Sequence, residues 1–254
     1  MKFDQHFLKD KKTLSKIASY SDIHYNDTIL EIGPGPGYLT EIILTQKPKK
    51  LISIEIDYHF EEQLEKIKKE NFGKFEYEIA NALDFFESLH FNKIVANIPY
   101  SITEPLYEKI LKRHPELVVL THGKEFYDIV KTGLSKWSYY VEAFYDIILV
   151  EIIEGTRFEP STKTDSVIIR LERKDNPNKK DKLIQNLFIK KDRNIINCLM
   201  YSLVDTLEIS KREAHSIIKE IGIELDSIHN FNQLSNEEFL DIVNKLENVL
   251  ERDL

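Results

Sequence analysis

The tetrapeptide Asn97-Ile98-Pro99-Tyr100 carries groups that could activate an amine of low nucleophilicity. An exocyclic amine on a nucleobase is such a group, because its lone pair is delocalised into the ring. If the Asn97 side-chain oxygen and the Ile98 carbonyl each accept a hydrogen bond from the amine, its lone pair is directed at an electrophile without a general base. Pro99 stiffens the turn, and Tyr100 offers a flat face on which an unpaired base can stack. A strand-to-loop turn with a buried tyrosine would use the same residue types.

A second aromatic residue could close the other side of such a base. Phe158 lies in the segment RFEPSTKTDS, between the last two predicted strands. A phenylalanine in a loop is also a common core residue, so both roles stay open. We predict that Phe158 and the tetrapeptide form the catalytic site.

A glycine-rich segment upstream, ILEIGPGPGYLTEII at 29–43, predicts a ligand-binding turn between a strand and a helix. Gly33, Gly35 and Gly37 leave room for a ligand beside the backbone, and the helix that follows offers free N–H groups. A second strand, LISIEID, places Glu55 twenty residues after Gly35, where its carboxylate could accept hydrogen bonds from ribose hydroxyls. The alternative is a tight turn beside a solvated strand end.

The spacing of the glycines favours S-adenosylmethionine over a dinucleotide. G-P-G-P-G lacks the G-x-G-x-x-G register that holds a pyrophosphate, and S-adenosylmethionine has no phosphate. The end of a third strand, in IANALDFF, provides Asn81 and Asp84 as contacts to the adenine of this cofactor, although either could simply form a turn. We therefore expect methyl transfer from S-adenosylmethionine to an amine.

Short β-branched runs that alternate with helical stretches predict the element that positions these residues, a largely parallel sheet with helices on its faces. The last two strands should be antiparallel neighbours that close a mixed sheet. We predict an α/β fold, a Rossmann-like seven-stranded methyltransferase sheet. The predicted strands are 28–32, 51–56, 75–80, 93–98, 117–121, 143–152 and 165–171, and the predicted helices are 39–45, 58–69, 104–113 and 124–131.

The polar segment RKDNPNKKDK at 173–182 predicts a domain boundary. After it the sequence favours only helices, at 183–188, 193–207, 210–220 and 235–250, with Ser235 as an N-cap. We therefore predict a cofactor-binding catalytic domain, residues 1–175, and a small C-terminal all-helical domain, residues 176–254.

Composition and charge bound the class of protein. One cysteine, Cys198, excludes a disulfide framework and a cysteine-rich zinc site, so we expect a cytoplasmic protein without metal. No stretch is apolar enough to span a membrane. The net charge of −8 argues against a polyanionic partner, but residues 1–16 carry +3 and residues 173–193 carry +5. These two basic islands could contact RNA, or could be solvated surface.

In this order the motifs resemble those of the ribosomal RNA adenine N6-dimethyltransferases, the group that includes KsgA and the Erm resistance methyltransferases. The resemblance implies a Rossmann-like catalytic domain, transfer of methyl groups to N6 of adenine, and a helical domain that helps dock on RNA. It also implies that His6, Leu8, Gly33, Glu55, Asn81 and Asn97 contact the cofactor or the target amine, together with their neighbours Gln5, Ile56 and Ala82. The segments that carry it are QHFLKD (5–10), LEIGPGPGYLT (30–40), IEID (54–57), NAL (81–83), NIPYSITEPL (97–106), KEF (124–126), FEPSTKTDSVIIRL (158–171), LFIKKDRNIINCL and IGIELDSIHNFNQLSNEEF.

The chain departs from this family at several positions. The family has Asn at the position of His6 and Asp at that of Asn81, and its Gln-Lys-Glu element is here His122-Gly123-Lys124-Glu125. A neutral amide at 81 forms a weaker hydrogen bond than a carboxylate, which would lower cofactor affinity about fivefold to tenfold. The family's Pro-x-Pro-x-Val loop is replaced in this chain by PSTKT at 160–164.

We expect a monomeric enzyme that methylates adenine in small-subunit ribosomal RNA during ribosome biogenesis. Two alternatives remain. An Asn-x-Pro-Tyr site also serves methylation of another RNA, of DNA or of a protein amide. The same fold could also act as an assembly or transcription factor without catalysis, which the changes at His6 and Asn81 would allow.

Overall fold

The computed structural model describes residues 5–223 and 230–252. Residues 224–229, which belong to the segment IGIELDSIHNFNQLSNEEF, and residues 1–4 of the first basic island lie outside the described residues. Contacts divide the chain into two units, Met1–Tyr127 with Asp146–Arg173, and Asp128–Tyr145 with Lys174–Leu254.

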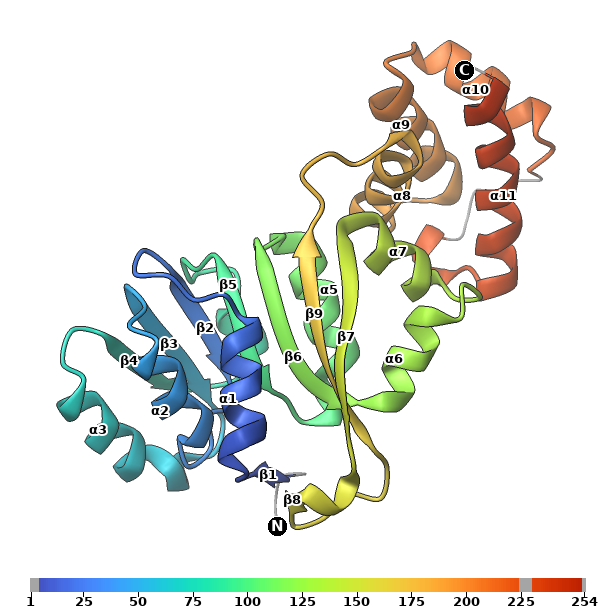
Figure 1. Cartoon of the computed structure of the whole chain (residues 1–254). Coiled ribbons are helices and arrows are strands. Elements are labelled where there is room, and N and C mark those ends of the chain that lie inside the picture. The colour runs from blue at the N-terminus through green and yellow to red at the C-terminus, as the bar shows by residue number, and fades with distance from the viewer. Residues whose placement is uncertain (1–4, 224–229, 253–254) are drawn as a thin grey trace. The chain divides into compact units, whose positions relative to one another are not determined.

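The first unit is built on a seven-stranded sheet in the order β4-β3-β2-β5-β6-β9-β7, which confirms the predicted mixed methyltransferase sheet (Figure 1). β2 pairs in parallel with β3 and β5, while β9 runs antiparallel to β6 and lies beside β7. Runs such as TILEI and KIVAN are almost wholly buried, as expected of parallel strands covered on both faces. The strands are β2 (Thr28–Ile32), β3 (Lys50–Glu55), β4 (Phe75–Ile79), β5 (Lys93–Asn97), β6 (Leu117–Gly123), β7 (Tyr145–Ile153) and β9 (Ser166–Arg173).

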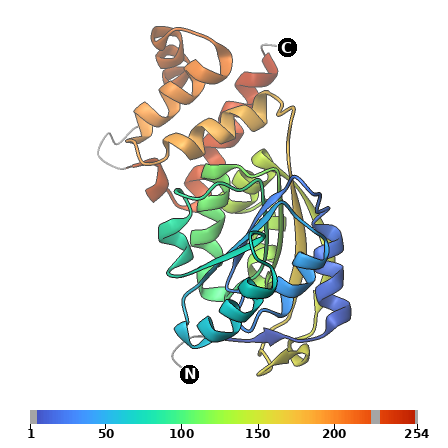
Figure 2. The same cartoon turned by 90° about the vertical axis from the view of Figure 1, so that its left-hand side faces the viewer.

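Helices cover both faces of this sheet. α1 and α2 contact each other on one face, and α5 lies on the opposite face (Figures 1 and 2). The Asp10 side chain caps α1 by accepting from the Thr13 backbone N–H at 3.0 Å. The helices and 3₁₀ turns are α1 (Lys11–Tyr20), α2 (Tyr38–Thr45), η1 (Tyr58–Phe60), α3 (Glu61–Glu70), α4 (Ala82–Phe85), η2 (Tyr100–Ile102), α5 (Thr103–Arg113) and η3 (Gly155–Arg157), while α6 (Lys124–Lys131) crosses from the first unit into the second after Tyr127.

A separate two-stranded sheet joins segments that are far apart in the sequence. β1 (Phe7–Leu8) pairs antiparallel with β8 (Phe158–Glu159), with Leu8 opposite Phe158. Both of these apolar side chains are buried in the core of the first unit. The N-terminal segment is thereby attached to the loop between β7 and β9.

The described part of the second unit is helical. Beyond residue 175 the order α8–α11 confirms the predicted helices, and Ser235 acts as the predicted cap, because its hydroxyl accepts from the Glu238 N–H at 3.2 Å. The unit also includes α7, where the sequence analysis started a strand at Ala143. Ala143 and Phe144 are instead the last two residues of this helix, which begins where the Ser135 side chain accepts from the Ser138 N–H. The helices and η4 are α7 (Lys136–Phe144), α8 (Lys179–Lys190), α9 (Ile195–Leu207), α10 (Lys211–Glu220), η4 (Phe231–Gln233) and α11 (Asn236–Arg252).

Candidate active site

The glycine segment forms the turn from β2 into α2, as predicted. Gly33, Gly35 and Gly37 have φ of +68°, +53° and +86°, a conformation that residues with a Cβ adopt only with strain. A Cβ on Gly35 would lie 2.7 Å from Cε1 of Phe7, so the Phe7 ring packs against the turn only because residue 35 has no side chain. The glycines therefore allow the left-handed backbone of the turn, and at Gly35 they also leave room for an aromatic side chain.

Glu55 at the end of β3 is held by this turn. Its Oε2 accepts from the Gly35 N–H and its Oε1 from the Asp57 N–H, both at 2.8 Å. Burial raises the pKa of the Glu55 carboxyl, while the backbone donors oppose that shift. Each carboxylate oxygen can accept a further hydrogen bond, so the group can still receive ribose hydroxyls.

Asn97 ends β5 and is half-buried. Its side-chain amide makes no hydrogen bond within the described part of the chain, which leaves the amide oxygen available to a ligand. The next residue is anchored, because the Ile98 N–H donates to the Thr121 carbonyl at 3.0 Å. Pro99 then leads into η2, where the Tyr100 hydroxyl lies 2.5 Å from Oγ of Ser166.

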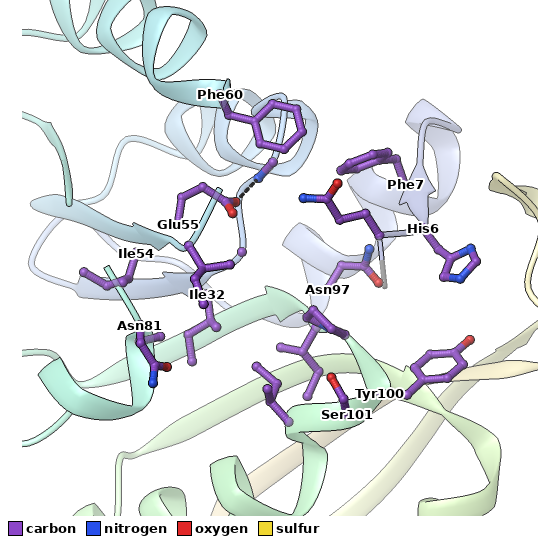
Figure 3. A pocket seen from close by; sticks show the side chains of 18 of the residues that line it. His6, Phe7, Ile32, Ile54, Glu55, Phe60, Asn81, Asn97, Tyr100 and Ser101 are labelled. Atoms are coloured by element: carbon purple, nitrogen blue, oxygen red, sulfur yellow. Dashed lines mark hydrogen bonds between the residues drawn. The ribbon is translucent and has the colours of Figure 1, made fainter. Parts of the chain in front are cut away.

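These segments surround one cavity of about 220 Å³ at the carboxyl ends of β2, β3, β4 and β5 (Figure 3). This is where open α/β sheets bind ligands. Figure 3 shows Glu55, Phe60 and Phe7 around one end of the cavity and Asn97, Tyr100 and Ser101 around the other. The predicted site residues that line it are Gln5, His6, Gly33, Gly35, Glu55, Ile56, Asn81, Ala82, Asn97, Ile98, Pro99, Tyr100 and Phe158.

Three predicted contacts do not line this cavity. Leu8 is 3% exposed and packs in the core, because its alternating neighbour Phe7 takes the cavity side of β1. Gly37 is the N-cap residue of α2, where a Cβ would meet the Ile67 side chain at 2.4 Å. Asp84 is exposed on α4, whereas Asn81 caps that helix by accepting from the Leu83 N–H at 3.2 Å.

Phe7 and Phe60 line the cavity and were missed by the sequence analysis. Their rings contact each other edge to face, with centroids 5.6 Å apart. The N-terminal segment that carries Phe7 is fixed by two polar contacts, Gln5 Nε2 to Asp57 Oδ2 and His6 Nδ1 to the Pro160 carbonyl, both at 2.8 Å. The position of Phe7 inside the segment QHFLKD was the only available signal.

Behind the glycine turn lies a fully buried carboxyl. Glu31 Oε2 accepts from Oγ1 of Thr40 at 2.8 Å and from Oγ of Ser53 at 2.7 Å. Its Oε1 has no partner within the described residues. Burial, with the charge of Glu55 as a lesser cause, raises the pKa of Glu31 to about 7.

Ion pairs neutralise part of both basic islands. Lys9 pairs with Glu159 and Lys16 with Glu151 in the first. In the second, Lys180 pairs with Glu247 and Lys190 with Asp205, two carboxylates outside that island. The positive charge left for a phosphate backbone is therefore smaller than the sequence alone suggests.

The described residues contain no cluster of three or more His, Cys, Asp or Glu side chains that could hold a metal ion. None of the helices in that part of the chain combines the length and apolarity that a membrane crossing requires.

The strand order, the glycine turn and the side chains at the strand ends define a Rossmann-type methyltransferase. The chain matches the family model "Ribosomal RNA adenine dimethylase" over residues 1–247, and it belongs to this family. The resemblance inferred from the motifs is thus confirmed.

Relatives extend over most of the chain. It is 30% identical over 256 residues to the ribosomal RNA small subunit methyltransferase A of Clostridium acetobutylicum, covering 92% of this chain and 91% of the relative. It is 29% identical over 236 residues to a probable enzyme of the same name from Methanopyrus kandleri, covering 87% and 83%. A crystal structure of a dimethyladenosine transferase from Plasmodium falciparum superposes with a TM-score of 0.64 at 23% identity, covering 96% and 98%, which supports the fold.

Proposed function

We propose that this protein binds S-adenosylmethionine in the cavity and transfers methyl groups from it to N6 of adenine in small-subunit ribosomal RNA. The observation that carries the proposal is the Asn97 amide, which lines the same cavity as the glycine turn and has no partner among the described residues. The names of the relatives supply the RNA substrate.

The cavity has the chemistry that this cofactor needs. Its lining is mostly apolar, with carbonyl, amide and carboxylate groups at a few points, as expected for a nucleoside with an amino-acid tail. The missing side chain of Gly35 lets the Phe7 ring pack against the turn and form part of the cavity wall. Glu55 would bind the ribose, and Asn81 would face the adenine.

When bound, the cofactor supplies an electrophilic methyl group. The protein's part is to orient the acceptor. Asn97 Oδ1 and the Ile98 carbonyl accept hydrogen bonds from the target amine, so that its lone pair points at the methyl, and Tyr100 stacks on the base. Phe158 is 5% exposed and forms part of the wall beside it. We also propose that residues 1–175 act as the catalytic domain and residues 176–254 as the RNA-recognition domain.

The test is methyl transfer from labelled S-adenosylmethionine to small ribosomal subunits that lack the modification. We expect N6-methylated adenosine in the digested RNA. An Asn97→Ala variant should lose at least about 100-fold in kcat, the usual effect of removing one preorganised polar group. Asn26→Ala, at an exposed position away from the cavity, is the matched control and should retain activity.

Other outcomes would contradict the proposal in different ways. Label in another nucleoside or in protein would move the activity to a different substrate. Cofactor binding without any transfer, beside an active family member as control, would favour a non-catalytic role.

A further inference from the structure

The ring of Tyr100 rests on the ends of two neighbouring strands. Gly123 ends β6 and Ser166 begins β9, and the two residues are direct partners in the antiparallel ladder. The Tyr100 hydroxyl lies 2.5 Å from Oγ of Ser166, which is fully buried. The ring thus has one fixed point at its hydroxyl.

The second fixed point is the backbone of Gly123. A Cβ built on Gly123 would lie 3.3 Å from both Cδ2 and Cγ of Tyr100 and 3.5 Å from Cδ1. Three ring atoms at nearly equal distance mean that a face of the ring, and not its edge, covers this residue. The ring also lines the cavity.

Gly123 is needed for space and not for backbone conformation. The glycines of the cofactor turn all have φ in the left-handed region, whereas Gly123 does not. An alanine would therefore fit the strand without backbone strain, and its cost would fall on the Tyr100 ring, which would have to move by a few tenths of an ångström.

A buried histidine fixes the strand end below this contact. His122 Nδ1 lies 2.9 Å from the Gly123 carbonyl, and because a carbonyl only accepts, Nδ1 is the donor. Nε2 must then accept from the Tyr107 hydroxyl, 3.0 Å away. The tautomer is set, and the backbone that supports Tyr100 is held from the core side.

We propose that Gly123 and Ser166 are positioning residues that together fix the plane of Tyr100, and through it the angle at which the target base presents its amine to Asn97. This inference rests on the proposed function. It adds two residues that do not themselves line the cavity and that were not among the predicted site residues.

A double-mutant cycle tests the hydroxyl contact. Tyr100→Phe and Ser166→Ala should each lower kcat about threefold to tenfold, the range for one hydrogen bond. The double variant should lose no more than either single variant, because both remove the same contact. The cofactor Kd, measured by calorimetry, should stay unchanged in all three.

Gly123→Ala tests the ring contact separately, and we expect about tenfold lower kcat, again with unchanged cofactor Kd. Ser21→Ala is the control for Ser166→Ala, because Ser21 is likewise a fully buried serine and donates a hydrogen bond to the Ile17 carbonyl at 2.8 Å, but does not line the cavity. It should leave kcat unchanged. If Ser166→Ala does not fold, Tyr100→Phe removes the same hydrogen bond from the other side.

The outcomes separate the two proposals. Multiplying losses in the double variant, or a Gly123→Ala enzyme with wild-type kcat, would overturn the role of the Gly123–Ser166 pair and leave the proposed function standing. A wild-type protein that transfers no methyl group would overturn the proposed function itself.

Discussion

Replacing the buried Glu31 by glutamine should change how the stability of the protein depends on pH. Glu31 is fully buried between β2, α2 and β3, and its hydrogen bonds from Thr40 and Ser53 do not offset the loss of solvation of a charge. Its pKa is accordingly raised from 4.5 to about 7.

The size of the effect follows from this shift. Between pH 4.5 and about 7, the folded protein holds a proton on Glu31 that the unfolded chain has already released. The free energy of unfolding should therefore contain a contribution that is fully present below pH 4.5 and is lost as the pH rises through 7. At 1.36 kcal/mol for each pKa unit, the loss between pH 5 and 8 is about 3 kcal/mol.

Glutamine at position 31 does not titrate. Its oxygen can accept from Thr40 and Ser53 as Oε2 does, but its NH₂ group would occupy the site of Oε1, where the described residues offer no partner. The O–H of protonated wild-type Glu31 lies at the same unpartnered site, so the acid and the amide each lose about 1–3 kcal/mol there. Glu31→Gln should thus be close to wild type in stability at pH 5 and more stable than wild type at pH 8.

Urea denaturation of the cofactor-free protein at pH 5, 6, 7 and 8 measures this. The difference between the wild-type and Glu31→Gln unfolding free energies should change by about 3 kcal/mol over the series, whatever the constant penalty of the amide. Glu41→Gln, at an exposed position of α2, is the control and should run parallel to wild type. Parallel curves for Glu31→Gln as well would refute the reasoning.

Three further predictions concern the cavity and its support. Gly35→Ala should lower cofactor affinity more than tenfold in calorimetry, because the new Cβ would displace the Phe7 ring. Gly73→Ala is the control, since Gly73 also has a left-handed φ but open space around it, and it should lose only about 1 kcal/mol of stability. Equal cofactor affinities of the two variants would contradict the role of Gly35. Burial lowers the pKa of His122 to about 4, so its contribution to stability is complete above pH 6.5 and is lost as the pH falls towards 4. His122→Gln should remove this loss of about 3 kcal/mol on the acid side, measured in denaturation curves. A variant with the pH dependence of wild type would contradict this prediction. Asn81→Asp keeps the cap of α4 and adds a charged acceptor, so cofactor affinity should rise about fivefold to tenfold, and a decrease would place another group at the adenine.

The strands and the glycine turn could be predicted because their signal is local. A parallel strand buried on both faces needs a continuous apolar run, and TILEI and KIVAN supply one. The end of such a strand marks the ligand edge of the sheet, which is why strand ends, the Asn97 tetrapeptide and the family motifs together pointed to Glu55, Asn81 and Asn97.

Helix ends and side-chain directions were harder to predict. α7 contains the aromatic run Trp137, Tyr139 and Tyr140, residue types with little helix preference, and it forms because Ser135 caps it and its apolar face is buried. The family motif likewise identifies the segment of Leu8 but not its direction. In β1 successive side chains alternate, and it is Phe7 that faces the cavity.

The part of the site that the sequence could not give is made by contacts between distant segments. Gly35 looks like a residue chosen only for its turn, yet its missing side chain also accommodates Phe7, which β1 brings there by pairing with β8 about 150 residues later. Gly123 repeats the arrangement at the other end of the cavity, where the ladder with Ser166 gives Tyr100 its place. In both cases a glycine leaves space and an aromatic ring from elsewhere in the chain fills it. A substitution at either glycine should therefore act on the site through that ring, and removing the ring together with the glycine should cost less than the sum of the two single changes.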